Sequence, residues 1–336
     1  RLSIYHSQYP SLQIPEDPKT RVFTLAFIGL LTLAGCGSKW RQKAESLQTL
    51  QAEDSPVKEQ AEGWMLIRRL PKAYGLSGDW MDDPGCPAFL MGAYLDKGRL
   101  VIQVEGDTLL IRQELEQKIG SSAFRLEQTN DSVVSQKRLR LLRDEVSKRL
   151  SFPENADINK NIVGYGVGIH HLSVDLIVNT PERQKEFREK IVDSPALHFR
   201  GSGMDELCTQ VGTNDTLGIH LEPERSVYPC STQTVTFILH NTRYVYDKDS
   251  EGMAYYGERY SLAYERDGKW YQLPINGNFV DLLTVAGPGR HTLTADLYPE
   301  VHSNKPGRYR YFKEVSVGEK REKVLLMAEF RLAGED

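Results

Sequence analysis

The stretch GAYLDKGRLVIQVEGD (residues 92–107) decides the fold of the first half of the chain. In its second half, Leu100, Ile102 and Val104 alternate with Arg99, Val101 and Gln103. This alternation predicts a half-buried strand. Asp96-Lys97-Gly98 is typical of a tight turn and joins this strand to an apolar, aromatic strand over residues 88–95. The stretch therefore predicts a β-hairpin.

The residues that follow extend this hairpin into a larger unit. Apolar spacing predicts a helix over residues 109–119, with Asp107 or Thr108 as its N-cap. A short strand is expected over residues 123–126. The order strand, strand, helix, strand defines a ββαβ unit.

The same order recurs further along the chain. Strands are expected over 163–169, 174–178 and 195–199, with a helix between the last two that Thr180-Pro181 begins. Gly166 lies 74 residues after Gly92, and the alternating apolar positions of the two segments are also 74 residues apart. This common spacing indicates an internal duplication. An amphipathic helix within 132–150 separates the copies. Residues 65–203 are therefore predicted to be an α+β module, a duplicated ββαβ with small antiparallel sheets packed on helices.

GAYLDKGRLVIQVEGD together with GYGVGIHHLSVDLIV (residues 164–178) resembles the pro-regions of bacterial secreted serine proteases of the alpha-lytic type, over residues 85–200. The resemblance implies a duplicated small sheet on helices that templates the folding of a protease. No trypsin-like domain is expected to follow, because about 135 residues are too few for its two barrels and no Gly-Asp-Ser-Gly turn is present. We therefore expect a related scaffold used for binding.

From about Thr216 onward, the sequence predicts a series of strands separated by turns. Strands are expected over 219–224, 235–241, 260–274, 291–298, 307–315 and 324–332. Asp267-Gly268 marks a hairpin turn within the third of these. The pattern predicts an all-β antiparallel sandwich over residues 214–334.

Several stretches of this region, such as Gly268-Lys-Trp270 followed by Leu273-Pro274, resemble a bacterial immunoglobulin-like domain. The resemblance implies a stalk or adhesion-type module without catalytic residues. Trp270 is expected to lie in the core or between the sheets.

The N-terminal part carries a different signal. Lys19 and Arg21 precede 13 apolar or small residues at 22–34, too few to span a bilayer but typical of a secretory signal. Leu33, Ala34 and Gly35 then lead to Cys36 and resemble the lipobox of bacterial lipoproteins. The resemblance implies diacylation of Cys36 and cleavage before it, and several acyl chains anchor a protein stably. The alternative is a buried apolar helix that contains a cysteine.

This interpretation divides the N-terminal region. Residues 1–35 would be an extension and signal peptide, with the polar residues ahead of the signal indicating a wrongly assigned start. Residues 36–64 would be a polar, flexible or partly helical tether on a lipid. We expect the protein in the bacterial cell envelope, on the outer membrane or on the outer face of the plasma membrane.

Few residues form a constellation that could carry chemistry. Cys208 and Cys230 flank the start of the sandwich, and an envelope compartment would permit a disulfide between them. His170-His171 is expected to be a surface turn rather than a metal site, since spacing places no further ligands. Asp82-Asp83 is expected to be a solvated turn rather than a calcium site. No metal, cofactor or catalytic set is predicted.

Composition restricts the partners. The chain has 336 residues, 26% of them charged, and a formal net charge of −4, so no broad basic field is available for nucleic acid. One helix face is basic and is expected to be solvated or to lie against anionic lipid: Lys137, Arg138, Arg140, Arg143, Lys148 and Arg149.

Three functional hypotheses follow. The first is a non-enzymatic envelope lipoprotein that binds a protein or glycan partner. The second is a trans-acting inhibitor or folding chaperone of a secreted serine protease. The third, a hydrolase with an unrecognised site, lacks any assembled acid, base or nucleophile in the sequence.

Overall fold

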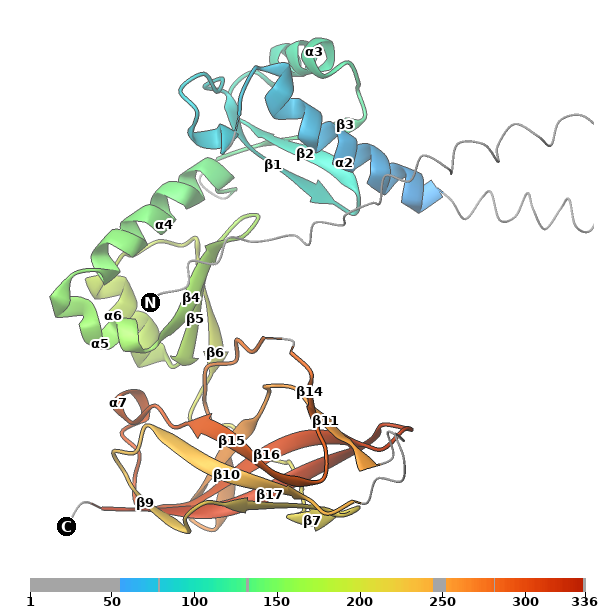
Figure 1. Ribbon diagram of the computed structural model, residues 1–336. Coiled ribbons are helices and arrows are strands. Elements are labelled where there is room, and N and C mark those ends of the chain that lie inside the picture. Colours follow the sequence, from blue (N-terminus) through green and yellow to red (C-terminus); the bar gives the residue numbers. More distant parts are fainter. Residues whose placement is uncertain (1–54, 78, 131–132, 244–251, 281, 335–336) are drawn as a thin grey trace, which may run out of the picture. The chain divides into compact units, whose positions relative to one another are not determined.

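The computed structural model describes residues 55–334, apart from 78, 131–132, 244–251 and 281 (Figure 1). The expected leader and most of the expected tether lie outside these residues. The described chain forms two compact units. One extends to Leu141 and includes Gly168–His170, and the other contains Leu142–Val167 and the residues from His171 onward. The expected α/β module at 65–203 is therefore divided between two units.

The first copy of the repeat has the predicted order of elements. It consists of β1 (Leu90–Asp96), β2 (Arg99–Val104), α3 (Thr108–Ile119) and β3 (Phe124–Gln128). β1 and β2 are antiparallel, and β2 and β3 are parallel. The Asp107 carboxylate accepts hydrogen bonds from the backbone N–H groups of Leu109 and Leu110, which confirms Asp107 as the N-cap.

A helix precedes this copy, where the sequence indicated only a flexible or partly helical tether up to residue 64. α2 (Ser55–Ala73) crosses the expected boundary at residue 64, so the end of the expected tether belongs to the first copy. Leu66 and Leu70 are buried against β1, β2 and α3. The helix approaches so closely that a Cβ at Gly63 would lie 1.9 Å from the Gly98 carbonyl oxygen. Only glycine allows this backbone contact. A 3₁₀ turn, η2 (Trp80–Asp82), follows.

The second copy repeats this topology. It contains β4 (Ile162–Val167), β5 (Leu172–Val178), α6 (Pro181–Lys190) and β6 (Leu197–Ser202), again with an antiparallel and then a parallel pairing. Between the copies lie α4 (Gln136–Leu150), η3 (Pro153–Asn155) and α5 (Ala156–Lys160). The predicted duplication is confirmed in topology. A β-bulge precedes Gly92 in β1 and Gly164 in β4, so Gly164, rather than Gly166, is the counterpart of Gly92.

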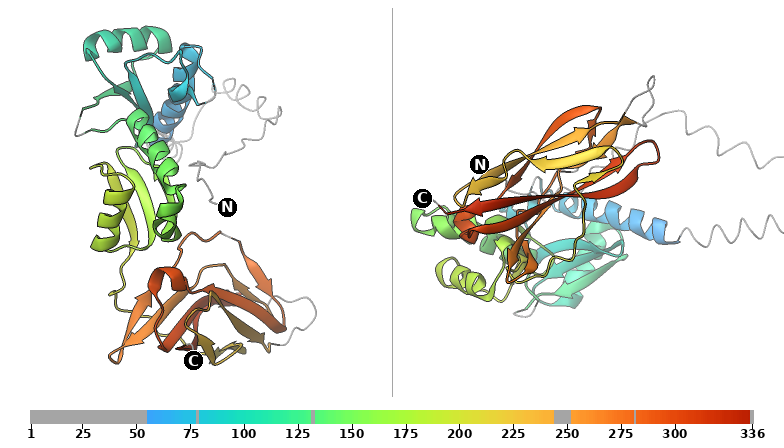
Figure 2. Two further views of the ribbon diagram at one scale, coloured as in Figure 1. Left: turned by 90° about the vertical axis from the view of Figure 1, so that its left-hand side faces the viewer. Right: turned by 90° about the horizontal axis from the view of Figure 1, so that it is seen from below.

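The C-terminal region is the predicted β-sandwich (Figure 2). One sheet has the order β15-β10-β8-β7, and the other contains β13-β12-β16-β11-β14, with β17 beside β16 and β9 beside β17. The strands are β7 (Asp215–Thr216), β8 (Ile219–Pro223), β9 (Val227–Pro229), β10 (Thr234–Asn241), β11 (Ala254–Tyr256), β12 (Ser261–Arg266), β13 (Lys269–Leu273), β14 (Thr284–Ala286), β15 (Gly289–Asp296), β16 (Gly307–Val317) and β17 (Glu322–Ala333). A short helix, α7 (Pro299–His302), follows β15.

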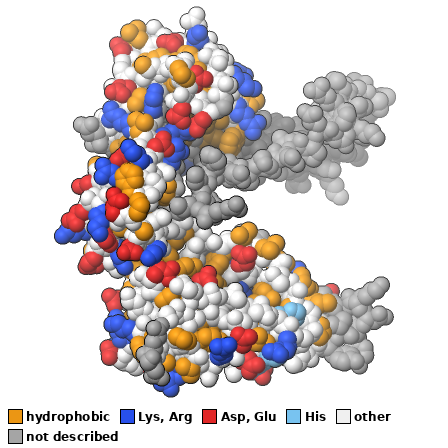
Figure 3. Space-filling view, turned by 60° about the vertical axis from the view of Figure 1, so that its left-hand side comes forward, with side chains coloured by type: hydrophobic (Ala, Val, Ile, Leu, Met, Phe, Trp, Pro, Cys, Tyr) orange, Lys and Arg blue, Asp and Glu red, His pale blue; other side chains and the backbone are white. Residues whose placement is uncertain are grey.

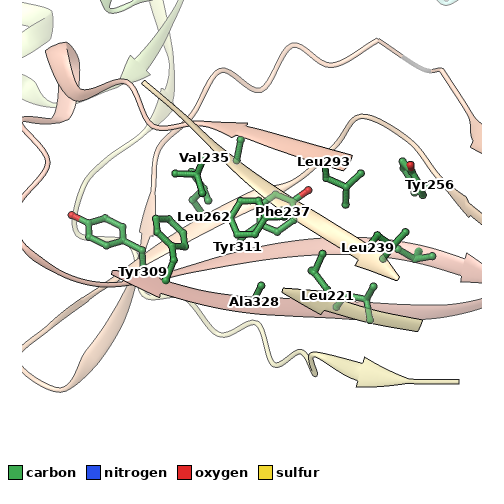
Figure 4. Close-up of a cluster of buried hydrophobic side chains, with 14 of the residues drawn as sticks. Leu221, Val235, Phe237, Leu239, Tyr256, Leu262, Leu293, Tyr309, Tyr311 and Ala328 are labelled. Atoms are coloured by element: carbon green, nitrogen blue, oxygen red, sulfur yellow. The ribbon is translucent and has the colours of Figure 1, made fainter. Parts of the chain in front are cut away.

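Aromatic and aliphatic side chains fill the space between the two sheets (Figure 4). The Phe237 ring of β10 stacks on the Tyr311 ring of β16, with centroids 4.1 Å apart and planes 13° from parallel. Phe330 of β17 meets Phe237 edge-on at 5.6 Å. Offset stacking and edge contacts are the favoured arrangements of aromatic rings.

Asp267 and Gly268 both have positive φ, as the predicted hairpin turn requires.

Two buried polar side chains fix the loops of the sandwich. Asn241 donates to the carbonyl oxygens of Gly252 and Ala286 at 2.8 and 3.0 Å. The Lys313 ammonium donates to the three carbonyl oxygens of Gly257, Glu258 and Arg259 at 2.6, 3.1 and 3.0 Å, and burial lowers its pKa to about 8. These contacts meet the rule that buried polar groups are hydrogen-bonded.

Residues 206–213, here called the strap, connect the second copy to the sandwich. The strap pairs with the outer edge of β13 at Leu207 and with β17 at Thr213. Between these points Gln210 accepts a hydrogen bond from Ser261, and a Cβ at Gly212 would lie 2.8 Å from the Cβ of Met327. The strap therefore crosses the face of the sheet that points away from the core.

Candidate partner-binding face

One face of the sheet β4-β5-β6 points away from the α6 helix. Val174 and Phe199 are paired across β5 and β6, and Phe187 of α6 packs on Phe199 with ring centroids 5.3 Å apart. Because side chains alternate along strands, their neighbours point to the opposite face. We call this the open face. It consists of Gly164 and Gly166 of β4, Ser173 and Asp175 of β5, and His198 and Arg200 of β6.

An ion pair and a histidine pair give the open face its chemistry. The Arg200 guanidinium binds Asp175 through both carboxylate oxygens, at 2.5 and 2.7 Å. This bidentate pair raises the pKa of Arg200. The His198 ring meets His171 edge-on at 4.9 Å. The face thus presents a charged pair and imidazoles beside two residues without side chains.

The two glycines have no local structural reason to be glycine. Neither Gly164 nor Gly166 has a positive φ, and a Cβ at either would meet no described residue within 4 Å. Glycine inside a strand costs about 0.5–1 kcal/mol relative to alanine. Where φ is ordinary and space is available, a strand glycine often marks a close approach by another backbone or a ligand. The open face is therefore kept flat at a cost in stability.

The first copy shows what such a glycine can accommodate. A Cβ at Gly92 would lie 2.6 Å from the Gln103 Oε1 and 2.9 Å from the Cβ of Gln136, the first residue of α4. The Gln136 backbone N–H donates to the Gln103 Oε1 at 2.8 Å, and Gln103 is fully buried. Gln103 itself donates to Glu127 on β3 at 2.9 Å. In the first copy, the first turn of α4 covers the face.

The turn after β4 adds to this cover. The His170 Nδ1 lies 3.5 Å from the Gln103 Nε2, and its ring meets Tyr94 edge-on at 5.7 Å. The expected surface turn at His170 therefore packs on the first sheet, in the same compact unit. By register, Asp175 and Arg200 occupy the places of Gln103 and Glu127. Above Gly164, no described residue takes the place of Gln136.

The predicted lipidation site cannot be placed, because Leu33, Ala34, Gly35 and Cys36 lie outside the described residues. The expected disulfide is wrong in this structure, since Cys208 and Cys230 are not bonded to each other. Cys208 lies on the outer edge of β13, and Cys230 follows β9, with β12, β16 and β17 between them. Adjacent strands are about 4.8 Å apart, whereas bonded cysteines need Cα atoms within about 7 Å.

Other residues singled out in the sequence have structural partners. Asp82 pairs with Arg140 at 3.2 Å, and Asp83 accepts the Gly85 N–H at 2.8 Å, so this turn is an ion-paired Asx turn. Several arginines of the basic helix face are also paired, Arg138 with Glu105, Arg143 with Asp144 and Arg149 with Glu145. On the side of the molecule drawn in Figure 3, Lys and Arg side chains lie among Asp and Glu side chains.

The expectation for Trp270 is wrong. Trp270 lies opposite Glu265 on the outer face of the sandwich, and the Arg310 guanidinium sits 3.8 Å above its ring. A cation over an aromatic face is a stabilising arrangement. Strand alternation gave no means of choosing the buried face here, because β13 carries an aromatic residue on each side.

Two family matches agree with this geometry. Residues 137–202 match a Pro-like C-terminal domain. The match contains the second ββαβ copy and all of the open face. Residues 215–331 match a bacterial Ig-like domain and cover most of the sandwich. The chain thus carries a Pro-like region followed by an Ig-like domain.

The other comparisons add little. The hypothetical protein PH1083 from Pyrococcus horikoshii OT3 is similar at 12% identity over 37% of this chain and 96% of that chain, with a TM-score of 0.20. A similarity at this level has no bearing on function. A search of curated proteins found no match. In the described part of the chain, no helix is long and apolar enough to cross a membrane.

Proposed function

We propose that the chain is a non-enzymatic lipoprotein of the bacterial cell envelope that binds a protein partner through the open face of its Pro-like region. One observation carries the proposal. Gly164 and Gly166 keep the face flat without a conformational or steric need, and the equivalent glycine of the first copy accommodates another segment of the chain. The Ig-like domain would act as a stalk or a second binding module.

The first copy suggests how a partner would bind. There, Gln136 approaches the sheet at Gly92, donates its backbone N–H to Gln103, and accepts the Ala93 N–H through its side chain at 3.3 Å. In the second copy, Asp175 occupies the place of Gln103 and offers a carboxylate acceptor. A partner segment with a free backbone N–H would fit over Gly164 in the same way.

Blocking the open face should abolish partner capture without unfolding the protein. We expect Gly164→Lys to lower the yield of partner crosslinked in intact cells at least tenfold, because the new side chain would occupy the place of the partner segment. The measurement is quantitative mass spectrometry of crosslinked proteins. Thr294→Lys, at an exposed position of β15, is the matched control and should keep the wild-type yield. Equal yields from both variants would contradict the proposal, as would recovery of only lipid and peptidoglycan fragments from the wild type.

The anchor requires its own test. If Cys36 carries the lipid, Cys36→Ser should move the protein from the membrane pellet to the soluble fraction, since a thioether cannot form on serine. Immunoblots of fractionated cells measure this, and labelling with an alkyne fatty acid should disappear in the same variant. A variant that remains in the pellet would show that another segment holds the protein on the membrane.

A trans-acting inhibitor or folding chaperone of a secreted serine protease is the second candidate. The Pro-like match over residues 137–202 favours it. The crosslinking experiment separates the two candidates by the identity of the partner. A secreted serine protease, inhibited at stoichiometric amounts of this chain, would support the second.

A further inference from the structure

Two histidines face each other on the outer surface of the Ig-like domain. His220 of β8 and His240 of β10 are directly paired across the antiparallel ladder, and their ring centroids are 5.9 Å apart. Their neighbours Leu221 and Leu239 point into the core, so both imidazoles point outward. Each histidine keeps about a third of its side chain exposed, at 32% and 28%. Solvent and small ions can therefore reach both rings.

A carboxylate lies between the two rings. Glu222 is two residues after His220 on β8 and shares its face. Its Oε1 lies 2.9 Å from the His240 Nε2, and its Oε2 lies 3.6 Å from the His220 Nε2. Both Nε2 atoms are thus turned towards one carboxylate.

A second carboxylate supports one of the rings from behind. The Asp215 Oδ2 on β7 lies 3.9 Å from the His220 Nδ1, on the side of the ring opposite Glu222. Histidines that bind a metal through one ring nitrogen commonly donate the other N–H to a carboxylate, which fixes the tautomer. Asp215 is beyond hydrogen-bond distance here, but a small approach to Nδ1 would let it accept that N–H and leave Nε2 as the ligand atom.

We propose that His220, His240 and Glu222 bind a divalent transition-metal ion, with Zn²⁺ as the best match to two imidazoles and one carboxylate. Two nitrogens, one oxygen and an open fourth position are a common zinc arrangement, and the fourth ligand would be water or a partner group. The inference is independent of the open face, because these residues lie on a different sheet.

Binding requires a small rearrangement of side chains. In the described part of the chain, no group of three or more His, Cys, Asp or Glu side chains lies in an arrangement that could hold a metal ion as it stands. Here Glu222 occupies the point on which the nitrogens converge, and must turn aside so that an ion about 2.1 Å from each nitrogen can take its place. Glu222 is half exposed, so it can move without disturbing the core. Arg290, opposite His240 on β15, is the nearest cation by register and is exposed.

Titration of the full chain with ZnCl₂ tests the proposal. Isothermal calorimetry at pH 7.5 should show a saturable site with one equivalent of Zn²⁺. His220→Gln, His240→Gln and Glu222→Gln should each weaken binding at least tenfold, while Asp215→Asn should weaken it less than they do. The matched control is His198→Gln, which removes a ring from the other histidine pair and should leave binding unchanged. Thermal unfolding without metal confirms that each variant is folded.

Three results would overturn the assignment. The first is the absence of saturable binding by the wild-type chain. The second is a folded His240→Gln variant that binds Zn²⁺ as tightly as the wild type. The third is loss of the site in His198→Gln, which would place the metal on the His171–His198 pair instead.

Discussion

Replacing Phe237 by alanine is expected to lower the free energy of unfolding of the Ig-like domain by about 3–5 kcal/mol. Phe237 is fully buried, stacks on Tyr311 and meets Phe330 edge-on. The substitution removes apolar surface from the core and leaves a cavity lined by rings that cannot collapse into it. Urea unfolding followed by tryptophan fluorescence measures the change, with Trp270 as a reporter inside the domain.

Two further variants make this result specific. Phe237→Leu fills part of the cavity and should cost clearly less than the alanine variant. Val285→Ala removes an apolar side chain that is 54% exposed, and should change stability by less than about 0.5 kcal/mol. Equal losses from Phe237→Ala and Val285→Ala would mean that the stack between the sheets contributes little.

Gly92→Val and Gly164→Val should have opposite effects on stability, although the two glycines are counterparts in the repeat. We expect Gly92→Val to cost about 3 kcal/mol, because its side chain would collide with Gln103 and Gln136 and break a buried hydrogen bond. Gly164→Val meets no atom within 4 Å of its Cβ and places a β-branched residue in a strand. It should leave stability unchanged or raise it by up to about 1 kcal/mol.

Differential scanning calorimetry of the full chain measures both variants. A loss of several kcal/mol for Gly164→Val would show that the open face is already covered in solution. The binding proposal would then lose its support. A neutral Gly92→Val would instead show that the first turn of α4 is not held against the first sheet.

The repeat could be predicted from the sequence because both copies bury the same alternating positions. The pairing of Gly92 with Gly166 was wrong by two residues, since the register pairs Gly92 with Gln103 and Gly164 with the equivalent Asp175. Side chains alternate with a period of two, so a slip of two residues preserves the pattern, and Gly164 and Gly166 both fit it. Sequence spacing alone therefore could not fix the register, and the structure was needed to recognise Gly164 as the counterpart.

The candidate site was less accessible to sequence reasoning. Gly164 and Gly166 can be read from the sequence as strand glycines, but only the structure shows that no other described residue lies within 4 Å of a Cβ built at either position. His220 and His240 are 20 residues apart and become neighbours through strand pairing. Helix α2 was hard to recognise because its first half is polar and because Gly63 interrupts its apolar pattern. The glycine is required there by the close contact with the turn at Gly98.

The strap also has a mechanical consequence. Each end is held by two backbone hydrogen bonds, which include Cys208 N–H to the Trp270 carbonyl at one end and Met327 N–H to the Thr213 carbonyl at the other. In contrast, β16 and β17 share a ladder from Gly307–Leu332 to Val317–Glu322. A pulling force that enters the Ig-like domain from its N-terminal side acts on the strap first. The strap already spans the sheet from the edge of β13 to β17, so release of its ends would free the eight residues from the domain before the core is loaded. The strap would then detach at a lower force than the core strands, and its release would protect the core from tension along the chain.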